Sequence, residues 1–305
     1  MSFKKRACWP LAASLGLVLL LASTPAPEST GAVIEVTDDM GRTVKLEKAP
    51  QRVVSLAPSN TESLFTIGGG SLLVGVTDFC NYPPEALDLP KVGGFADINL
   101  ELVVSMDPDL VLADSLHIPE IVPALEGLGI PVAVIIPQSI DGVLASLRLV
   151  GTLTGFEEAA AEFAASLENR RDQLTTMVAG QPAPRVFWEL SGDLWTAGPG
   201  SFVDDLITTA GGSNVAADAG NAWVQLNAEV VIASDPEFIF LADHPYGEDT
   251  GTVSSRPGWS ELTAVVQGRV IEIVDVDTIS RPGPRVMDAL AYIARTLHPG
   301  VFTDQ

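Results

Sequence analysis

Residues 98–112 read INLELVVSMDPDLVL, and residues 226–240 read LNAEVVIASDPEFIF. The second stretch starts 128 residues after the first (226 − 98) and matches it in register. Each copy predicts a helix with an Asn cap, an Asp-Pro turn and a buried strand. Any helix–turn–strand unit has similar apolar spacing, but identical polar residues in register favour an internal repeat. The identical positions of the first copy are Asn99, Glu101, Val103, Asp107 and Pro108.

The chain on either side of each copy alternates between short apolar runs and helical patterns. Such alternation is typical of buried parallel sheets, and a β-hairpin at 33–36 and 43–46 precedes it. The predicted strands are 52–56, 72–76, 110–113 and 132–136, followed in the second half by 185–190, 238–241 and 270–274. The predicted helices are one that begins at Pro58, then 99–105 and 119–128, and later 202–210, 228–233 and 285–297.

The middle of the chain, residues 141–178, has apolar residues at helical spacing and no strand pattern. Gly151 and Gly155 are possible breaks, and a helix over 157–178 would be about 33 Å long. The sequence therefore predicts an α/β fold of two Rossmann-like lobes with central parallel sheets, joined by a long rigid α-helix. The expected parts are a signal peptide and spacer at 1–32, an N-terminal lobe with its hairpin at 33–140, the interlobe helix at 141–180 and a C-terminal lobe at 181–305.

The first residues predict export. Three basic residues at positions 4–6 precede an uncharged, apolar run at 11–22, which is the pattern of a secretory signal. The alternative is a membrane anchor that is retained, because no single cleavage site stands out. We expect the protein at the periplasmic or extracellular face of the cell membrane. Its formal net charge of −22 disfavours nucleic acid as a partner, because phosphates would be repelled.

Motifs for catalysis and for metal binding are absent from the sequence. There is no phosphate-binding GxxxxGK[ST] loop, no HExxH and no GxSxG. The three histidines, His117, His244 and His298, are far apart and do not have metal-ligand spacing. We therefore expect no enzyme activity, no catalytic residues, no resident cofactor and no site for a bare transition metal.

Five aromatic residues follow predicted strands or precede the repeated helices. In a two-lobed α/β protein, loops at the carboxyl ends of the strands face a shared crevice, where large rings form a wide apolar wall. Any one of these rings could instead pack in a core, but their matched placement before each repeat favours ligand binding. The candidate rings are Phe79, Tyr82, Phe95, Trp195 and Trp223.

Two pairs of charged residues are further candidates. Glu101 and Glu229 are equivalent in the two repeats, so each lobe presents one carboxylate that paired arginines of a partner could bind. A favourable interaction with the helix dipole explains either glutamate alone. Asp277 and Arg281 follow a strand and could hydrogen-bond a ligand, or they could form a surface ion pair.

At these residues the chain resembles the class III periplasmic solute-binding proteins, the cobalamin and ferric-siderophore group, and is most similar to its cobalamin binders. The likeness covers roughly residues 34–297, and the order and spacing of the motifs make it specific. The motifs are RVVSLAPSNTESLFTIG at 52–68, VGVTDFCNYPPEA at 74–86, VGGFADINLELVVSMDPDLVLA at 92–113, GLGIPV at 127–132 and RPGPR at 281–285.

The resemblance implies two lobes bridged by a rigid helix, with little closure on ligand binding. It also implies that Glu101 and Glu229 dock onto permease arginines, and that Asp277 and Arg281 make polar contacts with the ligand. Four of the rings, at 79, 95, 195 and 223, would surround it. The chain departs from the cobalamin binder where that protein has Tyr and Trp at the positions of Phe79 and Phe95, and Trp at the position of Asp114.

We therefore expect an exported, monomeric solute-binding protein that captures a corrinoid between its lobes and delivers it to an ABC permease dimer with a separate ATPase. A ferric-siderophore or haem binder of the same fold is an alternative. Anionic chelates should require several arginines in the cleft, and only Arg256, Arg281 and Arg285 are plausible. A secreted α/β enzyme is the alternative from another class, since a fold alone does not fix a function.

Overall fold

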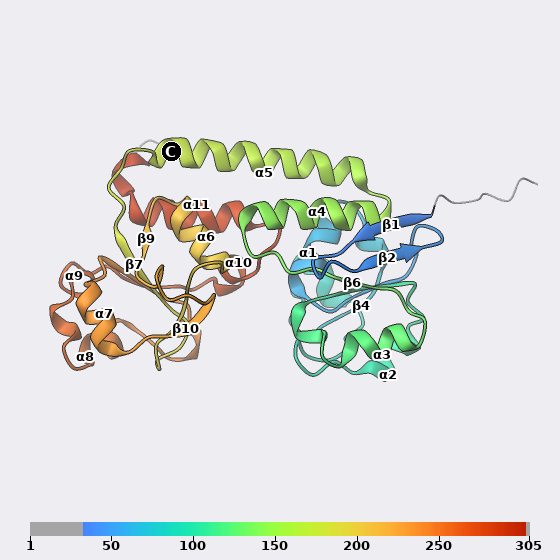
Figure 1. The fold of residues 1–305 in the computed structure, drawn as a ribbon, viewed down its shortest axis with the longest axis horizontal. Helices are drawn as coiled ribbons and strands as arrows, with labels where there is room; N and C mark the ends of the chain where they lie inside the picture. The colour runs from blue at the N-terminus through green and yellow to red at the C-terminus, as the bar shows by residue number, and fades with distance from the viewer. Residues whose placement is uncertain (1–32, 303–305) are drawn as a thin grey trace, which may run out of the picture. The chain divides into compact units, whose positions relative to one another are not determined.

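The structure is a computed structural model that describes residues 33–302. The predicted signal segment 1–32 lies outside the described residues. Within them the chain forms two α/β lobes, each built on a parallel four-stranded sheet. Figure 1 shows helix α5 spanning both lobes, with α4 between α5 and the N-terminal lobe and α11 on the side of the C-terminal lobe. The predicted fold class is confirmed.

The N-terminal lobe opens with an antiparallel hairpin and continues into a parallel sheet with strand order β4-β3-β5-β6. Its strands are β1 (Ile34–Thr37), β2 (Thr43–Leu46), β3 (Val53–Ser55), β4 (Leu73–Val76), β5 (Leu110–Ala113) and β6 (Val132–Val134), and its helices are α1 (Pro58–Thr66), α2 (Leu100–Ser105) and α3 (Ile121–Gly127).

The C-terminal lobe has a parallel sheet with strand order β12-β11-β7-β9 and a separate antiparallel ribbon of two strands, β8 and β10. Its strands are β7 (Arg185–Glu189), β8 (Trp195–Ala197), β9 (Ser213–Asn214), β10 (Trp223–Gln225), β11 (Phe238–Leu241) and β12 (Val270–Glu272). Its helices are α6 (Phe202–Thr209), α7 (Ala228–Ser234), α8 (Thr250–Ser255), α9 (Thr263–Val266), α10 (Val276–Ser280) and α11 (Val286–Leu297).

The two parallel sheets have the same topology. When the strands of each are numbered along the chain, both sheets have the order 2-1-3-4. The order reverses between the first and third strands, which are β3 and β5 in one lobe and β7 and β11 in the other. In open α/β sheets, ligands bind outside the carboxyl ends of the strands at this reversal. The topology therefore marks one candidate crevice in each lobe.

The internal repeat is confirmed as a structural repeat. The Asn99 and Asn227 side chains cap α2 and α7 by accepting hydrogen bonds from the backbone N–H groups of Leu102 and Val230. The aspartates that follow the two helices adopt the left-handed conformation, with φ of 49° and 41°. Each Asp-Pro pair thus ends a helix and turns the chain directly into a fully buried strand.

Two helices join the lobes, because the predicted interlobe segment breaks once. Helix α4 (Ile140–Thr154) ends at Gly155, whose φ of 81° is the left-handed conformation that closes a helix. Helix α5 (Glu157–Val178) then runs back along α4. Gly151 does not break α4. It lies instead where α5 packs against α4. A Cβ there would lie 2.5 Å from the Cβ of Ala160, so the missing side chain lets α5 approach α4.

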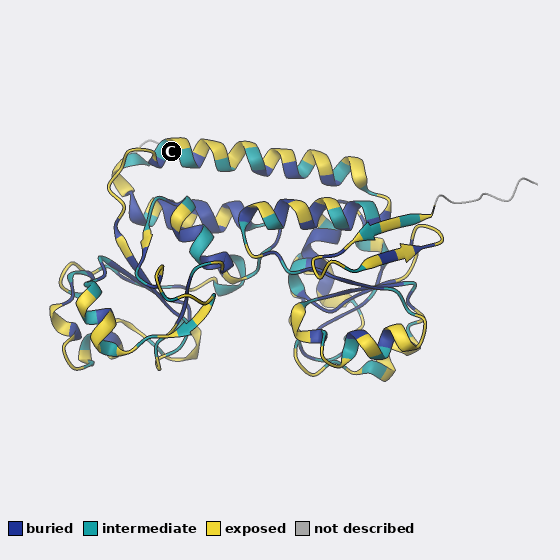
Figure 2. Ribbon diagram, in the orientation of Figure 1, coloured by how far each residue is buried: buried dark blue, intermediate teal, exposed yellow. Residues whose placement is uncertain are grey.

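A continuous apolar core passes from one lobe to the other through these helices. It includes Val53 of the first sheet, Leu147 of α4, Val186 of the second sheet and Leu290 of α11. The opposite faces of the two sheets have separate small cores, represented by Val111 and Ile239. Figure 2 shows buried residues on the inward face of α4 and α11 and an exposed outer face of α5. The lobes are therefore joined by packing as well as by the chain.

The sequence patterns missed the β8–β10 ribbon and the short helices α8, α9 and α10. Three-residue strands and helices of four to six residues contain too few residues to show a periodicity. Among residues 33–302, no helix combines the length and the apolar character that crossing a bilayer requires.

The α4–α5 contact generates a stability prediction. Gly151→Ala places a methyl group against Ala160 and 3.1 Å from the Phe156 carbonyl, so we expect it to lower the free energy of unfolding by about 1–3 kcal/mol. The matched control is Gly127→Ala in α3, where a Cβ meets nothing within 4 Å, and this change should be neutral or stabilising by up to about 1 kcal/mol. Urea unfolding measures both, and equal midpoints would contradict the packing described here.

Candidate ligand-binding site

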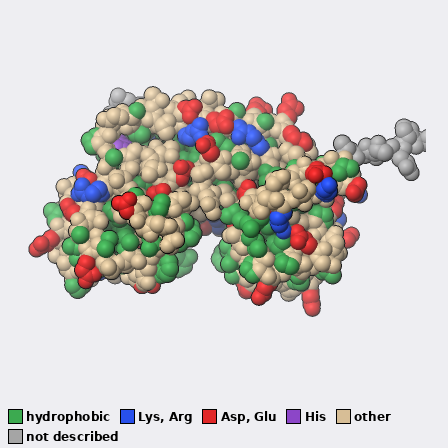
Figure 3. Space-filling model, viewed as in Figure 1, with side chains coloured by type: hydrophobic (Ala, Val, Ile, Leu, Met, Phe, Trp, Pro, Cys, Tyr) green, Lys and Arg blue, Asp and Glu red, His purple; other side chains and the backbone are tan. Residues whose placement is uncertain are grey.

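A cavity of about 330 Å³ lies between the lobes. Figure 3 shows the cleft that separates the lobes on the side away from α5, with hydrophobic side chains on both of its flanks. The N-terminal lobe contributes Ala57, Pro58, Ser59, Phe79, Phe95 and Asp114, and the C-terminal lobe contributes Asp277, Ser280, Arg281 and Pro282. The cavity thus brings together four of the predicted ligand-binding residues, which are Phe79, Phe95, Asp277 and Arg281.

The cavity lies at the topological reversal of the first sheet. Residues 57–59 follow strand β3, and Asp114 directly follows strand β5. These two strands are neighbours in the sheet, so the chain leaves both at the same edge and diverges. The crevice between the diverging segments is the position at which α/β sheets bind ligands.

Phe95 is held in the cavity wall by a histidine that the sequence patterns did not single out as functional. The buried imidazole of His117 packs edge-on against the Phe95 ring, with 5.4 Å between ring centroids. Its Nδ1 accepts from the Asp114 N–H at 3.0 Å, so Nε2 is the nitrogen that donates to the Phe95 carbonyl at 2.9 Å. Burial lowers the pKa of His117, which favours this neutral form.

Trp195 and Trp223 lie on the β8–β10 ribbon and outside the cavity lining. Trp195 is opposite Gln225 and Trp223 is opposite Ala197, so both indoles project from the same face of the ribbon as diagonal neighbours. Both are exposed, Trp223 by 54%. In Figure 1, β10 lies on the side of its lobe that faces the N-terminal lobe. The ribbon that carries both rings therefore lies toward the N-terminal lobe but outside the cavity lining.

Tyr82 has a different environment from the other predicted rings. It is absent from the cavity lining, and the Arg285 guanidinium lies 4.4 Å from the centre of its ring. Because Arg285 belongs to the other lobe, this is a cation–π contact between lobes. The structure thus places Tyr82 beside the cavity, at the junction of the lobes.

Arg281 is occupied by protein groups even though it lines the cavity. It donates to Glu62 at 3.0 Å and to the Asn81 amide oxygen at 2.7 Å, and its side chain is only 12% exposed. Asp277, which also pairs with Arg281 at 2.7 Å, keeps 47% of its side chain exposed. Of this pair, Asp277 therefore presents the more accessible group to a ligand. The surface ion pair considered from the sequence is in fact a network between the lobes.

The Glu62 carboxylate is the centre of that network. It is 1% exposed in α1 and accepts from Arg285 at 2.8 Å through both Nε and a terminal nitrogen. Although burial opposes it, the nearby Glu62 carboxylate raises the pKa of Arg285. Two guanidinium groups of the C-terminal lobe thus neutralise one buried carboxylate of the N-terminal lobe.

The cleft has an acidic balance because all three candidate arginines are paired. Arg256 donates to both oxygens of Glu189 at 2.7 and 2.6 Å and binds Glu248 at 2.8 Å. The other two guanidiniums bind Glu62, whereas Asp114 and Asp277 face the cavity from opposite lobes. The cavity edge therefore suits a ligand with hydrogen-bond donors better than an anionic one.

The equivalent crevice of the C-terminal lobe is filled by charged side chains. Glu189 ends strand β7, and Asp243 follows strand β11 by two residues. Both are buried, and within residues 33–302 no group hydrogen-bonds either carboxylate oxygen of Asp243. Burial, together with the Glu189 and Glu248 charges, raises the pKa of Asp243 to about 6, while the Arg256 charge opposes this. Burial also raises the pKa of Glu189.

These raised pKa values generate a pH prediction. A carboxyl group that is easier to protonate in the folded state loses its contribution to stability as pH rises from about 4 through about 6. Asp243→Asn keeps the neutral form, so its stability advantage over the wild type should grow by up to about 3 kcal/mol between pH 4 and pH 7. The control is Asp218→Asn at an exposed position.

Urea unfolding at several pH values measures this difference. Parallel stability curves for wild type and Asp243→Asn would show that Asp243 does not titrate in this range. The Asp218→Asn curve should follow the wild type throughout, because this exposed carboxyl group is solvated in both the folded and the unfolded state.

Glu101 and Glu229 occupy matching places on separate lobes. Each is exposed in the first turn of its helix, two residues after the capping asparagine, on α2 and α7. Among the residues that the structure describes, no ion pair includes either glutamate. Both carboxylates are thus available to a partner.

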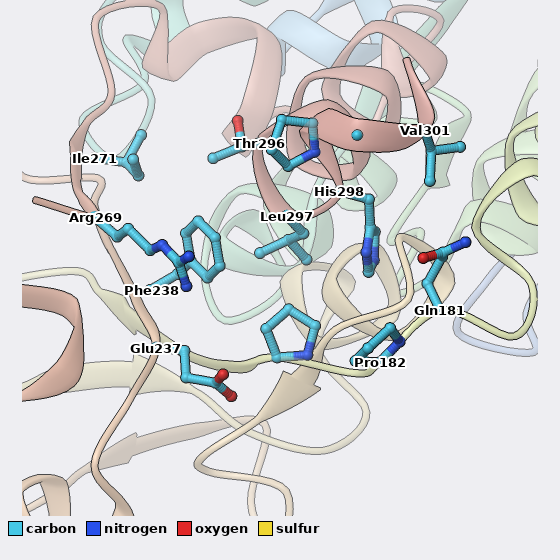
Figure 4. Close-up of a pocket in the computed structure, with 13 residues that line it drawn as sticks. Gln181, Pro182, Glu237, Phe238, Arg269, Ile271, Thr296, Leu297, His298 and Val301 are labelled. Atoms are coloured by element: carbon cyan, nitrogen blue, oxygen red, sulfur yellow. The ribbon is translucent and has the colours of Figure 1, made fainter. Parts of the chain in front are cut away.

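A larger cavity of about 620 Å³ lies elsewhere in the C-terminal lobe and contains none of the predicted residues. Figure 4 shows Arg269 beside the Phe238 ring, where its guanidinium lies 5.0 Å from the ring centre. The acidic side chain in the lining of this cavity, Glu237, pairs with Arg185 at 3.4 Å. Its charged groups are therefore engaged with the protein, and the interlobe cavity is the better candidate site.

Two α/β lobes of matching topology, joined by packed helices and with a cavity lined from both lobes, define a two-lobed solute-binding protein. Within residues 33–302, no group of three or more His, Cys, Asp or Glu side chains is placed to hold a metal ion. Residues 53–276 match the periplasmic binding protein family. The chain belongs to this family, and the resemblance inferred from its motifs is confirmed.

Individual relatives differ in the ligand that their names give. The chain is 31% identical over 280 residues to the uncharacterized ABC transporter substrate-binding lipoprotein YvrC of Bacillus subtilis, covering 89% of this chain and 87% of that one. It is 33% identical over 271 residues to a cobalamin-binding protein of Halobacterium salinarum, covering 86% and 73%. The periplasmic heme-binding protein RhuT of Roseiflexus sp. RS-1, in apo form, has a TM-score of 0.73 at 29% identity, covering 82% and 99%.

Proposed function

We propose that this protein captures a corrinoid between its lobes, outside the cytoplasm, and delivers it to the permease of an ABC importer. The observation that carries the proposal is the interlobe cavity, which has the Phe79 and Phe95 rings in its N-terminal wall and one carboxylate from each lobe. Binding is non-covalent, so no catalytic residues are required, and the protein acts as a carrier and not as an enzyme. The cobalamin-binding relative supports the same ligand class.

The walls of the cleft suit the two kinds of surface that a corrinoid presents. Phe79 and Phe95 give the N-terminal wall apolar area, and Trp195 and Trp223 give it to the C-terminal wall. The amide groups at the edge of a corrinoid can donate hydrogen bonds to Asp277 and to Asp114, which stands where the cobalamin binders have a ring. An acceptor thus replaces apolar area at this one position.

A haem or a ferric siderophore is the alternative ligand, and the structural similarity to a heme-binding protein supports this alternative. Such chelates carry carboxylate or other anionic groups, which require unpaired cations for binding. Arg281 and Arg285 are bound to Glu62, and Arg256 is bound to Glu189. Recruiting any of them would take a cationic partner away from a buried carboxylate, which favours the corrinoid.

Ligand titration tests the cargo. Burial of about 300 Å² of apolar ligand surface supplies up to about 7–8 kcal/mol before the entropic costs of association, and hydrogen bonds at the cavity edge offset part of those costs. We therefore expect the purified protein to bind cyanocobalamin with a Kd of about 1–50 µM. Hemin should bind at least about tenfold more weakly. No saturable binding of any corrinoid at about 100 µM would reject this cargo.

The same titration tests the tryptophan wall. Trp223→Ala should weaken corrinoid binding by roughly tenfold or more, because it removes a large exposed ring from the cleft. Tyr246→Ala is the control, since that ring is 88% exposed and lies outside the cavity lining. Equal losses in the two variants would point to a general effect of ring removal.

Delivery to a permease rests on Glu101 and Glu229. Two exposed carboxylates in equivalent positions on two similar lobes match a dimeric permease with one arginine site on each subunit. A two-point contact fixes the orientation of the carrier over the translocation path, and it also increases the rate of encounter. The secreted enzyme alternative gives the paired glutamates no role.

Charge reversal separates docking from ligand capture. The double variant Glu101→Lys/Glu229→Lys should abolish corrinoid uptake by cells that contain the importer, while the Kd for cyanocobalamin stays within about twofold of wild type. Glu158→Lys/Glu162→Lys on the exposed face of α5 changes the net charge equally and should leave uptake intact. Uptake at the wild-type rate in the Glu101→Lys/Glu229→Lys variant would show that these two glutamates do not dock onto the permease.

A further inference from the structure

Five polar residues join the two lobes directly beneath the interlobe cavity. We call them the interlobe tie: Glu62 and Asn81 in the N-terminal lobe, and Asp277, Arg281 and Arg285 in the C-terminal lobe. Asn81 is the residue of this group that neither the sequence patterns nor the proposed function uses. Its amide contacts two charged side chains of the other lobe at once.

The geometry of Asn81 links the charges of the tie to the wall of the cavity. Its amide oxygen accepts from Arg281 at 2.7 Å, and its amide nitrogen donates to Asp277 at 2.9 Å. Arg281 also donates to the backbone carbonyl of Phe79 at 3.1 Å. Residues 79–81 of the N-terminal lobe are thus held in place by the C-terminal lobe.

Several residues belong to the tie and to the cavity at the same time. Asp277 and Arg281 line the cavity, and so does Phe79, whose carbonyl Arg281 binds. The lobes also touch here through backbone, since a Cβ at Gly283 would lie 3.4 Å from both Cα and Cβ of Ser59, which lines the cavity as well. Motion at the tie therefore changes the shape of the ligand site.

Separation of the lobes at the cavity is opposed by the charges of the tie. Glu62 is 1% exposed, and moving the lobes apart would leave its carboxylate without Arg281 and Arg285 in an environment that solvates ions poorly. The same motion would release Asn81 and the Phe79 loop. Lobe contact and an intact cavity wall are thus maintained by one set of bonds.

We infer that the interlobe tie is a release device, in which Asn81 and Arg281 couple contact between the lobes to retention of the ligand. A force that separates the lobes, such as docking at two points, breaks the tie and displaces Phe79 and the Asp277–Arg281 edge together. By linkage, a bound ligand must strengthen lobe contact as much as lobe contact strengthens ligand binding. This coupling rests on the proposed function, whereas the tie itself does not.

The first arm of the test needs no ligand. Spin labels on cysteines introduced at Leu128 and Val266, which are exposed on different lobes, report the distance between lobes by pulsed electron paramagnetic resonance. Asn81→Ala should broaden this distance distribution relative to wild type. Asn169→Ala, at an exposed position of α5, is the matched control and should not. An unchanged distance distribution in Asn81→Ala would show that the interlobe tie does not hold the lobes together.

The second arm measures ligand exchange by stopped flow. Cyanocobalamin is the probe, and hemin replaces it if the wild type does not bind cyanocobalamin, which separates failure of the cargo assignment from failure of the tie. Asn81→Ala should raise the dissociation rate constant about tenfold and leave the association rate constant within about threefold. A dissociation rate equal to that of Asn169→Ala would show that the tie does not control release.

A disulfide between the lobes should have the opposite effect to Asn81→Ala and slow ligand dissociation. Ser59→Cys/Gly283→Cys would place two Cβ atoms 3.4 Å apart across the lobes, close to the separation in native disulfides of about 3.5–4.5 Å. The oxidised protein should exchange ligand at least about tenfold more slowly than the same protein after reduction. Equal rates before and after reduction, with the disulfide verified by mass, would overturn the coupling even if Asn81→Ala alters folding.

Discussion

The buried carboxylate of Glu62 is the interaction on which the arrangement of this protein depends. A carboxylate without solvent requires compensating charge, and the two guanidiniums that supply it come from the other lobe. The apolar core that runs through α4, α5 and α11 aligns the lobes but leaves the cleft side open. The ion pairs supply the contact at the floor of the cleft, where the ligand cavity begins.

The two lobes use the same sheet topology in different ways. At the reversal of strand order in the first sheet, the chain leaves a cavity beside Ser59 and Asp114. At the equivalent place in the second sheet, the crevice is filled by three interacting charged side chains, which are Glu189, Asp243 and Arg256. The C-terminal lobe therefore reaches the interlobe cavity through α10 and the residues directly after it, and the two lobes are alike in fold but not in the way they use the crevice.

Most of the fold was predictable because its signals are local. The Asn cap, the Asp-Pro turn and the apolar strand lie within fifteen residues in each repeat, and both copies fold as expected. The β8–β10 ribbon was missed because each strand has three residues. For the site, Phe79, Phe95, Asp277 and Arg281 do meet, but Tyr82 contacts Arg285, and the roles of Glu62, Asn81 and His117 depend on partners distant in sequence.

The sequence by itself determined the two α/β lobes, the helical connection, the matched pair Glu101 and Glu229 and the family, since periodicity, capping and motif order are properties of neighbouring residues. Only the tertiary structure decided which charges remain available. An arginine in a sequence is a candidate for any anion, and its partner is known only when the chain brings a carboxylate to it from some 220 residues away, as Glu62 reaches Arg281 and Arg285. Burial of these three side chains engages both arginines with the protein and ties one lobe to the other.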